Sequence, residues 1–422
     1  MNTMQNEEHK NEAIVRIDTL LFASAFMLSI STNYIDASIY NNAILVLMVI
    51  SVSLHLLEKQ RLRVRKNIFY LTVAVIGIII YNFFISPLAT QKLLIHLSCF
   101  LIGYSICDYN IFEQRQFALN TILKTYMYIL LVTAAIGVLE SFVGNIFDPY
   151  AVRVYAATYR LHSVFLHPII FSLMMLQLFV LSHYYIDNRI VKSIVGFAAF
   201  YCIFMTLTRA AWLTFAIVII LLAVHRVFAL KEPIFRGKVF NKRRIIETGI
   251  VIVLLVILIS ESDLGRYIST FWNRWNALEG STSINYRSST ITAILDGIKR
   301  RSIIQWIFGA GNLSAQSLLG NYGIYFGRVG NNVVDNQWLA VFADFGLLGL
   351  FGLIYLLIYS FKSYFNKALG INIWALALCT ISILLVALVC DVFYWATAGC
   401  ISFIMFGLLY ANIQTSNRGS VL

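Results

Sequence analysis

The stretch VVDNQWLAVFADFGLLGLFGLIYLL, residues 333–357, decides the fold. Most of it is a continuous apolar run, long enough to cross about 30 Å of hydrocarbon as a helix. Yet it begins with Asp335, Asn336 and Gln337, and it carries Asp344 shortly before Gly346. The fold must therefore account for a membrane helix that starts on an acid and two amides.

Composition extends this interpretation to the whole chain. Of the 422 residues, 59% are hydrophobic and 12% are charged, and the mean hydropathy is +0.78. A soluble protein would carry about twice that charged fraction. Lipid offers no water to unpaired backbone groups, so only helices and closed barrels cross it. Because the apolar runs are continuous rather than alternating, they favour helices. We predict an all-α polytopic integral membrane protein.

The apolar runs divide into about twelve predicted spans. Residues 191–226 are too long for one span and hold Thr206, Thr208 and Arg209 in their middle, so we interpret them as a tight hairpin of two spans. The other predicted spans lie near residues 17–35, 39–57, 68–86, 91–107, 121–141, 167–186, 245–260, 336–360, 371–389 and 393–412.

Basic residues set the predicted orientation, because cytoplasmic loops accumulate Lys and Arg. If the N-terminus is cytoplasmic, every expected cytoplasmic loop is basic: 58–67, 108–124, 187–192, 226–244, 361–368 and the C-terminal tail. Both termini are then cytoplasmic, and we treat residues 1–422 as one transmembrane domain. Residues 142–166 form one outer loop, and 261–334 form a larger one between the ninth and tenth spans. The same rule explains the net charge of +12 without a nucleic-acid partner.

The large outer loop is predicted to hold a helix. Within it, Ile291, Ile294, Leu295 and Ile298 recur at helical spacing and predict an amphipathic helix at the outer membrane interface. Three tryptophans would sit at headgroup depth, and two glycines would end the helix; these residues are Trp272, Trp275, Trp306, Gly309 and Gly311.

Several arginines remain on the predicted outer side. Guanidinium groups bind phosphate oxygens in a bidentate fork, so a cluster at the outer mouth of a helix bundle suits a pyrophosphate. The alternative for any one of them is a pair with a nearby acid or with lipid phosphates. No cysteine or histidine has metal-ligand spacing, and the six cysteines are expected to be small core residues.

Four elements, taken together, resemble the O-antigen ligase/polymerase superfamily. The opening stretch resembles the ligase pattern H-[NSQ]-x9-G-x2-[GTY], with Asp335 in place of the histidine and with Asn336, Gly346 and Gly349 matching. The segment YRSSTITAILDGIKRRSIIQWIFGAG resembles the family's arginine, amphipathic helix and Gly-x-Gly element. MTLTRAAW resembles its hairpin with Arg209, and YRLHSVFLHP resembles the arginine segment that ends the earlier outer loop. The resemblance covers about residues 150–415.

The resemblance implies a GT-C-like membrane glycosyltransferase that acts at the outer face of the bacterial cytoplasmic (inner) membrane. Its members take a glycan from undecaprenyl pyrophosphate and pass it to an acceptor hydroxyl, with no cofactor and no metal. The implied partners are the lipid-linked donor, the glycan acceptor, the bilayer and a chain-length regulator protein. The absent histidine favours a polymerase that joins repeat units of O-antigen, capsule or exopolysaccharide over a ligase that uses lipid A core.

We assign roles by what the chemistry needs. Cations stabilise the departing pyrophosphate, and a base removes the proton of the acceptor hydroxyl. Arg209, Arg287 and Asp335 are the candidate catalytic residues, and Arg160, His162, Arg300 and Asn336 are the candidate substrate-binding residues.

Each of these roles has a structural alternative. Asp335 would serve either as the base or as a helix N-cap, and Arg209 would either bind pyrophosphate or reach the outer headgroups. His162 and His167 are alternative bases, each with a structural alternative of its own. A lipid-linked sugar flippase is the alternative from another class, but it would need a deep charged cavity.

Overall fold

The computed structural model describes residues 2–34, 36–59, 87–107, 112–147, 154–155, 158–229, 282–324 and 334–419, with isolated positions between 77 and 84 and between 270 and 273. These residues are nearly all helical. By length and composition, five helices could cross a membrane: Thr90–Cys107, Gln114–Val143, Pro168–Tyr185, Arg209–Val227 and Gln337–Phe365. The chain thus has the fold of a helical membrane protein. The predicted spans 68–86 and 245–260 lie wholly or largely outside the described residues, so the number twelve stays a prediction.

The chain divides into two compact units. The first unit holds residues 1–118, 279–359 and 387–422, and the second holds 119–278 and 360–386. The helices α5 (Phe112–Val143) and α14 (Gln337–Phe365) each have residues in both. The prediction of a single transmembrane domain stays a prediction.

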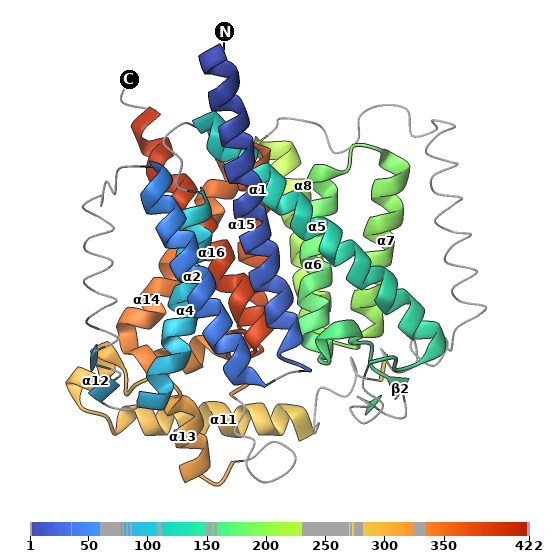
Figure 1. Cartoon of the computed structure of the whole chain (residues 1–422). Coiled ribbons are helices and arrows are strands. Elements are labelled where there is room, and N and C mark those ends of the chain that lie inside the picture. Colours follow the sequence, from blue (N-terminus) through green and yellow to red (C-terminus); the bar gives the residue numbers. More distant parts are fainter. Residues whose placement is uncertain are drawn as a thin grey trace. The chain divides into compact units, whose positions relative to one another are not determined.

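Four helices form the main body of the first unit: α1 (Asn2–Ser31), α2 (Ala37–Lys59), α4 (Pro87–Cys107) and α16 (Ala396–Gly419). The backbones of α4 and α16 touch at Gly103 and Gly407, where an added Cβ would collide with a carbonyl oxygen of the opposite helix. Both chain ends lie at the same end of this unit (Figure 1).

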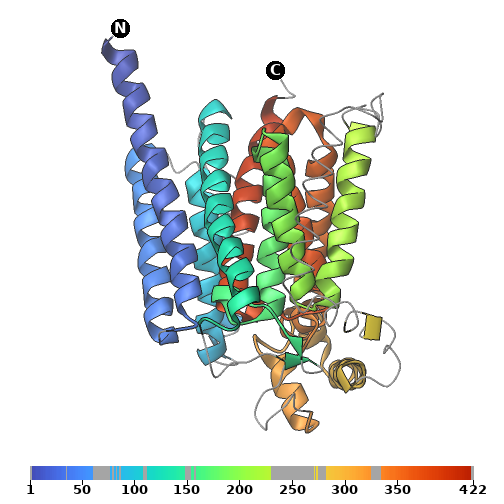
Figure 2. The ribbon, with the colours of Figure 1, turned by 90° about the vertical axis from the view of Figure 1, so that its right-hand side faces the viewer.

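Three shorter helices lie at the opposite end of the first unit, away from the chain ends (Figure 2): α11 (Thr282–Lys299), α12 (Ile303–Phe308) and α13 (Ser314–Asn321). The predicted helix in this part of the chain is confirmed as α11, and its placement at the membrane interface stays a prediction. Ile294 and Ile298 are buried among Ala315, Leu319 and the start of α14, whereas the other two apolar residues are exposed. One face of α11 therefore belongs to the protein core.

The second unit surrounds α6 (Pro168–Tyr185), which is buried along most of its length. It contacts α7 (Arg189–Met205), α8 (Arg209–Val224) and α15 (Ile371–Val386). The α7–α8 hairpin confirms that residues 191–226 form two helices, and of these two α8 is among the candidate membrane spans. A two-stranded antiparallel hairpin, β1 (Val154–Tyr155) and β2 (Thr158–Tyr159), precedes α6.

Short helical turns complete the described chain. They are the 3-10 turns Ser163–Phe165, Lys367–Leu369 and Val392–Tyr394 and the π-helical turn His225–Ala229. All six cysteines are buried and free, as the sequence predicted for core residues.

Candidate functional site

The amide Asn336, and not Asp335, caps α14. Its side-chain Oδ1 accepts the backbone N–H of Leu339 at 3.0 Å, and its carbonyl accepts from Ala340 at 3.0 Å. This is the contact pattern of an N-cap residue. The alternative that made Asp335 the cap is therefore wrong: the cap lies one residue later, and the carboxylate of Asp335 is left for another partner.

That partner is Arg287 on α11. Its Nε donates to Oδ2 of Asp335 at 3.3 Å, and the side chains are 32% and 14% exposed respectively. No described residue donates to Oδ1 of Asp335 or accepts from the two Nη groups of Arg287. Asp335 has a φ of 49°, in the left-handed region that aspartate tolerates better than most residues. The pair therefore presents two partly exposed groups: a carboxylate fixed by Arg287 and the guanidinium of Arg287 itself.

Burial raises the pKa of Asp335 above its ordinary value of 3.8, and the charge and hydrogen bond of Arg287 oppose that rise. A second acid, Asp391, belongs to the same surroundings. It is buried, its pKa is raised first by burial and then by the negative charge of Asp335, and Trp395 Nε1 donates to it at 3.3 Å. The sequence assigned no role to Asp391. Burial therefore favours the protonated form of both acids, and at Asp335 the charge of Arg287 opposes it.

The entry to α14 is tied to the segment that holds Asp391. The backbone N–H of Gln337 donates to the carbonyl of Ala387 at 2.8 Å, and its side-chain Oε1 accepts the N–H of Phe393 at 2.8 Å. Gln337 is buried. The three polar residues that open the helix thus have separate tasks: ion pair, cap and anchor.

Asp344, one of the acids of the opening stretch, organises the loop that precedes α13. Its carboxylate accepts the backbone N–H groups of Leu313 and Ala315, both at 2.9 Å, and the hydroxyl of Ser314 at 3.0 Å. Tyr394 also donates to it. Since Leu313 has no side-chain oxygen to cap α13, Asp344 supplies the cap from a distant part of the chain.

A break in α14 makes this contact possible. Gly346 has φ 63° and ψ −156°, so the helix is interrupted there and nearby carbonyls are released. The N–H groups of Ala310 and Gly311 donate to the carbonyls of Ala343 and Asp344 at 3.2 and 3.1 Å. Gly346 thus permits a backbone conformation, at positive φ, against which the Gly-x-Gly loop docks.

Arg301 also holds this loop, and the sequence did not single it out among the three adjacent basic residues. It donates to the carbonyl of Ala343 and, at 3.2 Å, to the hydroxyl of Ser314. Burial lowers the pKa of Arg301, and the charge of Asp344 opposes that change. The predicted binding residue Arg300, by contrast, is exposed just after α11.

In the second unit, Arg209 is the first residue of α8, directly after the turn at Thr206–Thr208. Arg160 binds that turn: its Nε donates to the carbonyl of Thr206 at 3.0 Å, and Nη2 donates to the hydroxyl of Thr208 at 3.3 Å. The structure therefore brings two predicted arginine segments together, with Arg160 engaged by the turn that precedes Arg209.

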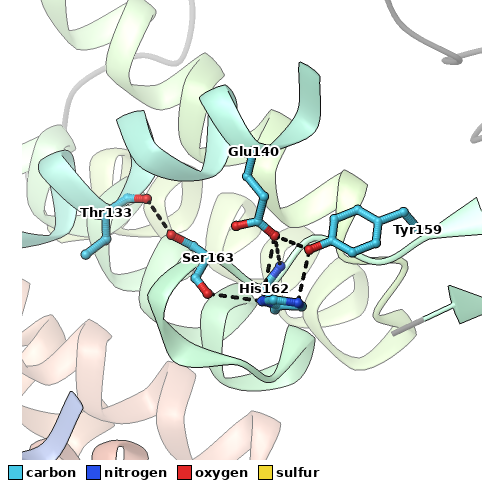
Figure 3. Close-up of polar contacts among 5 residues, drawn as sticks. All are labelled: Thr133, Glu140, Tyr159, His162 and Ser163. Atoms are coloured by element: carbon cyan, nitrogen blue, oxygen red, sulfur yellow. Dashed lines mark hydrogen bonds and ion pairs between the residues drawn. The ribbon is translucent and has the colours of Figure 1, made fainter. Parts of the chain in front are cut away.

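His162 lies in a buried polar cluster (Figure 3) that the sequence did not reveal. Its ring contacts Tyr159 through Nε2 at 3.0 Å, and its Nδ1 lies 3.7 Å from Oε1 of Glu140. His162 and Glu140 are both fully buried. A substrate-binding role for His162 would need contact with solvent, which this burial does not provide. The sequence did contain a sign of this cluster, because Glu140 is an acid within a predicted apolar span, and such acids are usually paired or functional.

The predicted site residues thus fall into two groups. Arg287, Asp335, Asn336 and Arg300 belong to the first unit, and the second unit holds Arg160, His162 and Arg209.

The fold and these polar elements define a helical membrane protein with paired arginine and carboxylate side chains at helix ends. Residues 194–354 match the family model described as O-Antigen ligase. No curated protein matches the chain. The match confirms, for this segment, the predicted resemblance to the O-antigen ligase/polymerase superfamily, whose members are glycosyltransferase-like enzymes. The matched segment contains Arg209, Arg287 and Asp335 but not Arg160 or His162.

Proposed function

We propose that this protein is a glycosyltransferase of the bacterial cytoplasmic membrane that polymerises undecaprenyl-pyrophosphate-linked repeat units at the outer face. The observation that carries the proposal is the Arg287–Asp335 pair beside a helix cap that Asn336 already provides. A carboxylate without a capping task, held by a partly exposed cation, fits a base next to an anion-binding group. The family match supports the glycosyl-transfer chemistry.

The proposed reaction is the transfer of the donor glycan to an acceptor hydroxyl, with one base and two cations. The acceptor hydroxyl oxygen forms a bond to the anomeric carbon of the donor glycan, and the bond from that carbon to the pyrophosphate oxygen breaks. The hydroxyl proton passes to Asp335, and the undecaprenyl pyrophosphate leaves with the electron pair. Arg287 and Arg209 each keep the role predicted from the sequence, which is to stabilise the charge on the departing phosphates, as fixed cations do when charge develops in a transition state.

A ligase that transfers finished chains to lipid A core is the second candidate, because the matching family model is described as O-Antigen ligase. Aspartate in place of the ligase histidine favours the polymerase. The flippase alternative has no support from the match, because the family consists of transferases.

Deletion of the gene followed by glycan analysis separates the three candidates. Loss of a polymerase leaves single repeat units at the surface, loss of a ligase leaves long chains on the lipid carrier, and loss of a flippase leaves repeat units at the inner face. We expect the first result. Unchanged surface polysaccharide in the deletion strain would overturn the proposal.

A further inference from the structure

The buried acid Glu140 on α5 needs an explanation, because a charged side chain within an apolar span is costly and is usually paired or functional. It is fully buried. Its Oε1 accepts from the hydroxyl of Tyr159 and from the backbone N–H of His162 at 3.4 Å. No described residue donates to its other oxygen, Oε2, which is also buried. A buried oxygen without a donor opposes stability, so Glu140 is not explained by stability alone.

Both ring nitrogens of His162 take part in the contacts of this cluster. Nδ1 faces two acceptors, the carbonyl of Ser163 at 3.0 Å and Oε1 of Glu140 at 3.7 Å, so it carries a hydrogen. Nε2 lies 3.0 Å from the hydroxyl oxygen of Tyr159, and this hydroxyl also donates to Glu140. Glu140, Tyr159 and His162 thus contact one another in one buried cluster (Figure 3).

This cluster holds a short segment, residues 159–163, from one side. The hydroxyl of Ser163 adds a bond to the carbonyl of Thr133 on α5 at 3.1 Å. From its other side the same segment holds the α7–α8 turn. The N–H of Leu161 donates to the carbonyl of Met205 at 3.2 Å, and Arg160 binds the carbonyl of Thr206 and the hydroxyl of Thr208. A continuous set of contacts therefore runs from Glu140 to the residue before Arg209.

We propose that Glu140 is a positioning residue for the transfer reaction: through Tyr159 and His162 it fixes the 159–163 segment, and Arg160 then fixes the turn from which Arg209 projects. The inference rests on the proposed function, because it assigns Arg209 to the pyrophosphate. Glu140 is buried and touches no substrate; it acts through Arg160. Residues 160–162 of this segment lie between β2 and the 3-10 turn Ser163–Phe165, so their position depends on such side-chain anchors.

Three variants of the full-length protein test the inference: Tyr159→Phe, which removes one hydroxyl from the cluster, Arg160→Ala, and the double variant. The matched control is Tyr126→Phe. Tyr126 lies on α5 in the same unit, is buried, and donates its hydroxyl to Gln177 on α6, away from the segment. The assay uses undecaprenyl-pyrophosphate-linked oligosaccharide extracted from the deletion strain, and it records kcat, donor KM and the melting temperature.

We expect Tyr159→Phe to raise donor KM about tenfold, which corresponds to the loss of one hydrogen bond to a charged group, while Tyr126→Phe leaves KM unchanged. In the Arg160→Ala background, Tyr159→Phe should not raise donor KM further, because the effects of two residues that act through one another are not additive. Similar melting temperatures for the two Tyr→Phe variants would show that the change in KM is not a folding defect.

The outcomes separate the two proposals. If the wild-type protein and Tyr126→Phe extend the glycan, and Tyr159→Phe does so with unchanged donor KM, the positioning role is wrong and the proposed function stands. Additive effects of Tyr159→Phe and Arg160→Ala would overturn the role of Arg160 as the intermediary. No glycan extension by the wild-type protein would instead refute the proposed function.

Discussion

At the scale of single residues, the polar start of α14 shows how neighbouring side chains divide their tasks. Asp335 pairs with Arg287 and adopts a left-handed conformation, while Asn336 caps the helix. Asparagine also tolerates this backbone conformation, so replacing Asp335 by Asn removes the charge with little backbone strain. That makes the charge and the cap separable by mutation.

Asp335→Asn should lower the rate of glycan transfer by about a hundredfold or more, the range for loss of a general base, with the melting temperature near that of the wild type. Asn336→Ala should instead cost about 1 kcal/mol of stability, because it removes the cap. Rates with the lipid-linked donor and thermal unfolding in detergent would measure both. Full activity of Asp335→Asn would exclude the base.

The pH dependence of the reaction follows from the same pair. Burial raises the pKa of Asp335, so the base becomes protonated as the pH falls, and the acid limb of the rate profile should lie above pH 3.8. Arg287 lowers this pKa, so Arg287→Gln should move the acid limb to higher pH. A pH–rate profile of both proteins would measure the shift; a limb that moves to lower pH or stays in place would contradict the assignment.

At the scale of elements, the break in α14 is the feature that most shapes the first unit. It lets the loop around residues 309–315 bond to Ala343 and Asp344, and a Cβ at Gly346 would lie 2.5 Å from the carbonyl oxygen of Ile307. The break thus joins α12 and α13 to the helix that begins at the candidate site.

Gly346→Ala should destabilise the protein by about 1–3 kcal/mol, since alanine would be strained at positive φ and would meet the loop backbone. Gly352→Ala is the matched control: it lies in the same helix, a Cβ there meets nothing within 4 Å, and alanine should be neutral or stabilising by up to about 1 kcal/mol. Thermal unfolding of the two variants gives the comparison. Equal stability would show that the break is not required.

At the scale of the whole molecule, the prediction concerns which end of the first unit faces the cytoplasm and which faces the outside. The chain ends lie at one end, and α11, α12 and α13 lie at the other (Figures 1 and 2). The basic-loop pattern predicts that the termini are cytoplasmic, so residues near α11 should be accessible from outside the membrane.

A single introduced cysteine tests this orientation. The native cysteines are all buried, so their background labelling should be low. Arg300→Cys is at an exposed position and should react with a membrane-impermeant maleimide in intact spheroplasts, whereas Ser416→Cys in the C-terminal part of the chain should react only after lysis. The reverse pattern would invert the predicted topology and move the candidate site to the cytoplasmic face.

The sequence by itself determined the class of the protein, most of the described helices and the α7–α8 hairpin with Arg209 at its turn. Apolar runs of this length have few alternatives in lipid, so local composition is sufficient for them. It also singled out Asp335 and Asn336, because polar residues beside a predicted span are conspicuous, and Arg287, because its segment resembles a family element.

Only the tertiary structure decided the partners of the polar residues. Asp344 holds Leu313, Ser314 and Tyr394, and Glu140 holds Tyr159 and His162, all across long separations in the chain. The assignment of the cap to Asn336 likewise needed the backbone geometry. A buried polar group must find a donor or acceptor wherever the fold brings one, and that choice depends on packing between elements rather than on the residues beside it in the sequence.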